Sequence, residues 1–136
     1  MANYNKFQCF VEDLAEGKHN LASDTLKVAF SNATNAPSAS LDKKLADITT
    51  IDPTNLGDTT LSKTSSSQTN GTYTLVLADK TLTATDDVPA FRYVIIYNDA
   101  ATDDPLICYF DYDSEVTLAS GDTFKLDFGD QLFSLA

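Results

Sequence analysis

His19 is the one histidine in this chain of 136 residues, and it is the first side chain to consider for chemistry. Catalysis at a histidine needs an orienting acid and a nucleophile close by. Ser23 and Asp24 are near in sequence, but their spacing matches no catalytic motif. A histidine that follows a turn at Gly17 is most often a surface group or a helix cap. The sequence therefore predicts no catalytic residue and no enzyme.

The acidic loop Asn98–Pro105 is the best candidate for binding a metal ion. Asp99, Asp103 and Asp104 supply the oxygen ligands that Ca²⁺ prefers. The loop lacks the alternating acidic positions, the central glycine and the closing glutamate of an EF-hand. Aspartate and asparagine also favour turns for local reasons. The sequence predicts a solvated turn here, with calcium as the alternative, and it indicates no cofactor.

Two further pairs of residues carry reactive groups. Asp111 and Asp113 are two positions apart, so they share one face of a strand, and paired carboxylates can hydrolyse sugars. Their position at a strand end favours a solvated rim instead. Cys108 lies in an apolar run and is predicted to be a buried thiol. With Cys9 as the one other cysteine, the sequence supports no disulfide framework.

The charge distribution limits which partners are possible. The net charge is −11, and residues 81–136 carry eleven acidic residues against Arg92 and Lys125. Nucleic acids and anionic lipids are bound through lysine and arginine, so neither is an expected partner. An acidic chain of this kind is suited to binding another protein. Copies of it repel one another unless they meet through neutral patches.

Two groups of side chains are candidates for a protein interface. An apolar stripe at helical spacing predicts a helix over Asn5–Glu16, ended by Gly17. This N-terminal helical segment, within residues 1–20, either covers the domain's own core or docks on a neighbour. Tyrosines on adjacent strands suit interfaces, although they equally suit the core and rim of a domain. The candidates are Phe7, Phe10, Val11 and Leu14 in the stripe, and Tyr93, Tyr97, Tyr109 and Tyr112 on the strands.

The rest of the chain predicts short strands separated by turns. Alternation at Leu26–Phe30 indicates a strand, and Asn70-Gly71 is typical of a type I′ hairpin turn. Thr54–Ser67 fits either an edge strand or a mobile loop. Further strands are expected at Ala46–Ile51, Thr72–Ala78, Thr81–Thr85, Phe91–Tyr97, Leu106–Tyr112, and in a last pair formed by Val116–Leu118 and Thr123–Phe128.

This pattern predicts one domain over residues 1–136. Its class is mainly β, an antiparallel, jelly-roll-like β-sandwich with one short N-terminal helix. The strand Phe91–Tyr97 is apolar on both faces and is expected at the centre of a sheet. Its side chains should divide into Phe91, Tyr93, Ile95 and Tyr97 on one face and Val94 and Ile96 on the other. The N-terminus has no apolar region typical of a signal peptide.

Several segments resemble small virion proteins of tailed bacteriophages, over most of the chain. The resemblance is carried by sequence style and not by a catalytic signature. The matching segments are Tyr4–Phe7, Phe10–Leu14, Gly17–Leu21, Asp24–Val28, Ala46–Ile48, Phe91–Val94, Tyr97–Asp99, Asp104–Ile107 and Gly121–Phe124.

The resemblance implies a capsid decoration, or cement, protein. Such a protein binds the outer surface of the phage head, bridges neighbouring capsomers and stabilises the shell. Its partner would be the major capsid protein, its location the outside of a virion assembled in the host cytoplasm, and its state on the shell a dimer or trimer. The alternatives are a tail or neck component of the virion and a carbohydrate-binding module.

Overall fold

The computed structural model describes residues 2–136, and it is mainly β, with 45% strand and 13% helix. Its sheets are antiparallel, they do not close into a barrel, and the described residues contain one α-helix. The largest sheet has the strand order β1-β7-β6-β2. Its strands are β1 (Asn3–Lys6), β7 (Leu106–Leu118), β6 (Val88–Asn98) and β2 (Leu26–Ser31).

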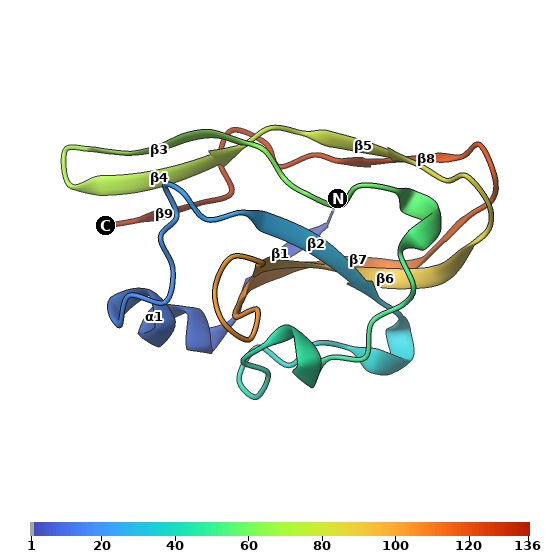
Figure 1. The fold of residues 1–136 in the computed structure, drawn as a ribbon, viewed down its shortest axis with the longest axis horizontal. Helices are drawn as coiled ribbons and strands as arrows, with labels where there is room; N and C mark the ends of the chain where they lie inside the picture. The colour runs from blue at the N-terminus through green and yellow to red at the C-terminus, as the bar shows by residue number, and fades with distance from the viewer. Residues whose placement is uncertain (1) are drawn as a thin grey trace.

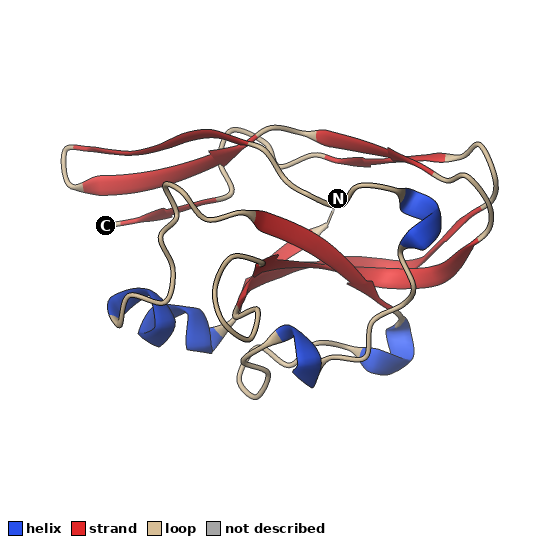
Figure 2. Ribbon diagram, viewed as in Figure 1, coloured by secondary structure: helices blue, strands red, loops and turns tan. Residues whose placement is uncertain are grey.

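Two smaller sheets lie over one face of this four-stranded sheet, and the α-helix and two of the three 3-10 turns lie on its other side (Figures 1 and 2). The third 3-10 turn, at residues 54–56, lies on the side of the smaller sheets, and its Leu56 joins the large hydrophobic cluster. One small sheet has the order β3-β4-β9 and the other pairs β5 with β8. Their strands are β3 (Lys63–Thr69), β4 (Thr72–Leu77), β9 (Phe133–Leu135), β5 (Lys80–Thr83) and β8 (Thr123–Leu126). The helices are α1 (Gln8–Ala15) and three single 3-10 turns, η1 (Ala33–Asn35), η2 (Leu45–Asp47) and η3 (Thr54–Leu56).

Both faces of the four-stranded sheet are buried, and strand β2 shows how its sequence divides between them. Leu26, Val28 and Phe30 point into the large hydrophobic cluster, as their alternation predicts. Ala29 lies between them in sequence and joins a smaller cluster on the opposite face. Strand β6 is likewise covered on both sides, as its doubly apolar sequence predicts. The large cluster fills the space toward the smaller sheets, and the small one lies under the helices and loops.

The N-terminal segment is divided differently from the prediction. The expected helix over Asn5–Glu16 is a strand, β1, followed by the shorter helix α1. Phe7 lies between them with an extended backbone, and its N–H donates to the carbonyl of Ile107 at 3.1 Å. Pairing of β1 with β7 satisfies backbone groups that a longer helix would have used internally, so the tertiary contact overrides the helical spacing.

The faces of β6 also differ from a strict alternation. Phe91 packs in the large cluster with Val94 and Ile96, and not with Tyr93. The register with β7 shifts between Phe91 and Tyr93, opposite a stretch of β7 where Asp113 has a φ of 63°. Such an irregularity inserts extra residues and reverses which face a side chain occupies.

The strand predicted at Ala46–Ile51 is wrong, because this region begins with the 3-10 turn η2. The carboxylate of Asp47 accepts hydrogen bonds from the backbone N–H groups of Lys43, at 2.9 Å, and Lys44, at 3.2 Å. Local capping by a side chain competes with strand pairing in this way.

The last predicted strand pair is also wrong. Val116–Leu118 belongs to the long strand β7, and Leu118 pairs with Val88 of β6. Strand β8 pairs with β5, which places the turn at Gly121 between two different sheets.

The Asn70-Gly71 turn is confirmed, with φ values of 52° and 84°. Both residues occupy the left-handed region that a type I′ hairpin requires. The Thr54–Ser67 segment combines the turn η3 with the start of β3, so the edge-strand interpretation holds for its second half.

Candidate partner-binding face

The exposed apolar side chains gather in the first part of the chain. Among residues 2–136, the exposed large hydrophobic residues are Tyr4, Val11 and Leu41, with 39%, 55% and 76% of their surface exposed. Tyr4 belongs to β1 and Val11 to α1. The loop that carries Leu41 is joined to α1, because the N–H of Gln8 donates to the carbonyl of Ala39 at 2.8 Å. We call α1 together with residues 38–44 the N-terminal face.

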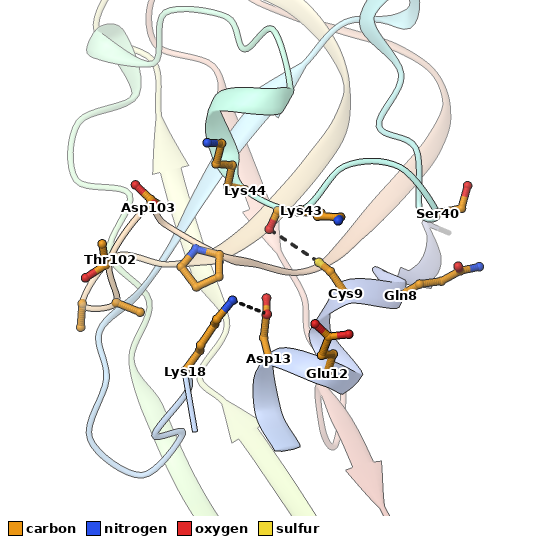
Figure 3. Close-up of a pocket in the computed structure, with 13 residues that line it drawn as sticks. Gln8, Cys9, Glu12, Asp13, Lys18, Ser40, Lys43, Lys44, Thr102 and Asp103 are labelled. Carbon is orange, nitrogen blue, oxygen red and sulfur yellow. Dashed lines mark hydrogen bonds and ion pairs between the residues drawn. The ribbon is translucent and has the colours of Figure 1, made fainter. Parts of the chain in front are cut away.

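A charged cleft of about 780 Å³ borders this face. Figure 3 shows α1 carrying Cys9, Glu12 and Asp13 on one wall, with the loop that bears Lys43 and Lys44 across from it. The cleft is closed by the loop between β6 and β7. Its lining residues are Gln8, Cys9, Glu12, Asp13, Lys18, Ser40, Lys43, Lys44, Ala100, Ala101, Thr102, Asp103 and Pro105.

The lysines of the cleft differ in how they are neutralised. Lys18 forms an ion pair with Asp13 at 3.1 Å, and the hydrogen bond that its ammonium group donates to this carboxylate raises the pKa of Lys18. Lys43 and Lys44 form no ion pair with any residue in the described range 2–136. In a chain with a net charge of −11, the cleft therefore presents two cations that are available to acidic groups of a partner.

Neither cysteine has the properties of a nucleophile. Burial, and then the neighbouring charge of Asp13, raise the pKa of the Cys9 thiol. Cys108 is fully buried, as its sequence context predicts, and burial raises its pKa strongly. Both thiols are free. Raised pKa values keep the thiols protonated, and the thiolate is the reactive form.

His19 is buried, with 6% of its surface exposed, so the prediction of a surface group is wrong. Its position is set by Asn98, whose side-chain carbonyl accepts the N–H groups of Ala100, at 3.0 Å, and Ala101, at 3.2 Å. The amide nitrogen of Asn98 then faces His19 Nδ1, at 3.0 Å, and Asp24 Oδ2, at 2.7 Å, and donates to both. This arrangement requires Nδ1 of His19 to be an acceptor, so its proton lies on Nε2.

This network is structural in character. Burial lowers the pKa of His19, and protonation of Nδ1 would remove the hydrogen bond from Asn98. The Nε2 atom of His19 has no hydrogen-bond partner in the described residues. Sequence reasoning missed the network because 79 positions separate His19 from Asn98. No local signal connects them.

The eight predicted interface residues fall into three groups by exposure. Phe7, Phe10, Tyr93 and Tyr97 are buried in their own chain. Leu14, Tyr109 and Tyr112 are half-buried, and Tyr109 packs against Tyr93 with ring centroids 6.1 Å apart. Val11 is the one exposed member of the set, with 55% of its surface exposed, so it is the residue of this set best placed to touch a partner.

Two of the aspartates considered for chemistry, Asp99 and Asp111, form ion pairs. Asp99 pairs with Lys27 at 3.3 Å, and within residues 2–136 no three aspartate, glutamate, histidine or cysteine side chains converge to hold a metal ion. Asp111 receives two hydrogen bonds from Arg92, at 2.8 and 3.2 Å, which lower its pKa. Asp113 has a φ of 63°, its backbone N–H donates to Asp111 Oδ1 at 2.8 Å, and its carboxylate accepts from the Asn3 side chain at 3.3 Å.

Comparisons with known proteins add no relative. No family model, no curated protein and no solved structure matches this chain. None of the helices found in residues 2–136 has the length and apolar character needed to cross a lipid bilayer.

Proposed function

We propose that this chain is a capsid decoration protein of a tailed bacteriophage, with a jelly-roll-like β-sandwich as its scaffold. In this role it binds the outer surface of the head, bridges neighbouring subunits of the major capsid protein and performs no catalysis. The resemblance of its segments to small phage virion proteins is the starting point for the proposal.

One observation carries the proposal furthest. The exposed large apolar side chains of residues 2–136 lie on β1, on α1 and on the loop bound to α1. Two of them, Tyr4 and Val11, lie within the N-terminal segments that carry the resemblance. Of the exposed side chains, Val11 and Leu41 lie on the joined segments of the N-terminal face, whereas Tyr4 packs on Phe110 in a separate groove. Exposed apolar residues on adjoining segments favour a protein-binding role, whereas scattered ones do not.

The mechanism follows from the chemistry of the N-terminal face. Val11 and Leu41 would bury apolar surface on a shell subunit, at about 25 cal/mol for each Å² removed from water. Lys43 and Lys44 would pair with acidic groups of the shell. Because each copy touches more than one subunit, weak contacts add up to a high avidity. A protein that binds only the assembled shell, and not its free subunits, stabilises the shell by mass action.

The test is to add the purified protein to heads that lack it and to image them by cryo-electron microscopy. Regular density between capsomers is the expected result. The variants Val11→Asp and Leu41→Asp should fold normally and lose occupancy. Thr83→Asp, an exposed position on β5, is the matched control and should keep full occupancy. Bare heads with the unmodified protein, or equal occupancy of all variants, would reject the proposal.

A carbohydrate-binding role is the second candidate, because one groove is rich in aromatic rings. The groove measures about 380 Å³ and lies between β1, β7 and the segment after β8. Tyr4 and Phe110 meet there edge to face, with centroids 5.6 Å apart, and Tyr112 lines it beside them. A glycan array distinguishes this role, since binding that Tyr4→Ala abolishes would favour it.

A further inference from the structure

The β3–β4 hairpin and its flanks are nearly free of charge. Residues 59–78 contain no acidic residue and one basic residue, Lys63, in a chain with a net charge of −11. The ammonium group of Lys63 donates to the backbone carbonyl of Asp24, so it is already bound within its own chain. The hairpin is therefore a region of the surface where repulsion between copies is weak.

Strand β3 is also an open sheet edge. It ends the sheet order β3-β4-β9 and spans seven residues. In a two-residue hairpin, the closing pair Thr69 and Thr72 exchanges its backbone hydrogen bonds, and the pattern then alternates along the strand. The N–H and C=O groups of Ser66 and Gln68 therefore point away from β4, toward an open side.

This edge lacks the features that normally prevent strand addition. Proteins protect edges with prolines, with charged side chains or by keeping the strand very short. Strand β3 has the sequence Lys-Thr-Ser-Ser-Ser-Gln-Thr, with no proline and no acidic residue. Its one charged side chain is at the first position and is already bonded.

An uncharged groove continues the same surface beneath the hairpin. It measures about 680 Å³ and lies between the inner side of the hairpin and the end of α1. Leu14 and Leu21 line one side of it, and Tyr73 and Leu135 line the other. No lysine, arginine, aspartate or glutamate is among its lining residues. The neutral surface is thus broader than the strand edge alone.

We propose that β3 pairs antiparallel with β3 of a second copy, joining two three-stranded sheets into one of six strands. Antiparallel pairing of a strand with itself has two-fold symmetry, and this is the commonest symmetry of soluble oligomers. A second copy is the occupant because each copy brings a strongly acidic surface, and this hairpin is where two such surfaces meet without opposing carboxylates. The pairing is independent of the proposal that the protein binds a phage head.

A register of the two β3 strands that is centred on Ser66 avoids repulsion between like charges. It places Ser65 of one copy opposite Ser67 of the other, and Lys63 opposite Thr69. No two like charges then face each other across the new interface. Ser65 and Ser67 are exposed, and their hydroxyl groups lie 3.3 Å apart on one face of the strand.

The test measures self-association in solution by sedimentation, without any capsid. The double variant Ser65→Glu/Ser67→Glu sets like charges directly opposite one another across the two-fold axis and should weaken the dimer by about tenfold or more. The double variant Ser65→Lys/Ser67→Lys should weaken it similarly. An equimolar mixture of the two variants should restore dimers, because opposite charges then face each other.

The matched control is Thr81→Glu/Thr83→Glu, which makes the same change at two exposed positions of β5 and should leave the dimer intact. Hydrogen exchange adds a backbone readout, since the amides of Ser66 and Gln68 should gain protection as the protein concentration rises. A monomeric unmodified protein at millimolar concentration would overturn the proposal. So would a dimer that the glutamate variant leaves unchanged, or a mixture that stays monomeric.

Discussion

The two ends of the molecule's longest axis differ in what their turns are made of. At one end the β3–β4 hairpin closes through Asn70 and Gly71, with no acidic side chain between residues 59 and 78. At the other end, the turns that follow β5 and β7 carry Asp86, Asp87 and Asp122 (Figure 1). These two acidic turns are joined, because the N–H of Ala84 donates to the carbonyl of Asp122 at 2.8 Å.

The aspartates at the acidic end help to form the turns that carry them. The Asp122 carboxylate accepts the N–H of Ala119 at 2.9 Å, and the Asp86 carboxylate accepts the N–H of Asp87 at 2.8 Å. The hairpin forms its turn without carboxylates, through the left-handed backbone of Asn70 and Gly71 and a hydrogen bond from the Gly71 N–H to the side-chain carbonyl of Gln68 at 3.1 Å. On this chain the chemistry of the turns therefore decides where negative charge collects. In the proposed dimer, this charge favours the approach of a second copy at the hairpin end.

Glycine substitution at each end should separate fold stability from association. Gly71 and Gly121 have φ values of 84° and 89°, and a Cβ atom at either position would meet nothing within 4 Å. Replacing either by alanine therefore costs only the left-handed backbone, about 1–2 kcal/mol of unfolding free energy. We expect similar losses in urea denaturation for Gly71→Ala and Gly121→Ala. Only Gly71→Ala should weaken self-association, and equal association of the two variants would contradict the role of the hairpin.

What the sequence could predict was set by how local each cause is. The alternation of Leu26, Val28 and Phe30 and the Asn70-Gly71 turn depend on neighbouring residues, and both are confirmed. The division of the N-terminal segment at Phe7 depends on pairing with β7, about a hundred positions away. A strand at the edge of a sheet gives little local signal when its residues also fit a helix.

The candidate site shows the same limit. The apolar stripe of Phe7, Phe10, Val11 and Leu14 was recognisable, but its spacing could not tell which members face the core. The exposure of Leu41 and the free charges of Lys43 and Lys44 depend on how a loop packs on α1. The burial of His19 depends on Asn98, which is brought beside it by the pairing of β2 with β6.

The His19 network, which lies beside the groove beneath the hairpin, predicts that folding stability depends on pH. Burial lowers the pKa of His19 below its ordinary value of 6.5, although the charges of Asp13 and Asp24 oppose this and Lys18 adds to it. The folded state therefore favours the neutral form of His19, and the contribution of His19 to folding stability is fully present above pH 6.5. As the pH falls below 6.5, the unfolded chain gains a proton first, and stability is lost until the folded pKa is reached.

We expect the urea midpoint to fall between pH 7 and pH 5, and to fall less in His19→Gln, which keeps a side-chain carbonyl to accept from Asn98. Carboxylates with lowered pKa values, such as Asp24, become protonated at lower pH, and this causes a further loss of folding stability there. A slope that is the same in the variant would show that His19 does not titrate on unfolding in this range.

The smallest expected effect comes from neutralising the acidic end. Asp86→Asn, Asp87→Asn and Asp122→Asn together remove three negative charges and retain the carbonyl groups that accept the turn N–H groups. If the copies meet at the hairpin, these charges act only through long-range repulsion, and the triple variant should dimerise a few-fold more tightly at low salt. The gain should vanish near 1 M salt, where the screening length is about 3 Å. If the gain survives high salt, or persists when Ser65→Glu/Ser67→Glu is added, the acidic ends themselves are in contact, and the contrast between the two ends does not govern assembly.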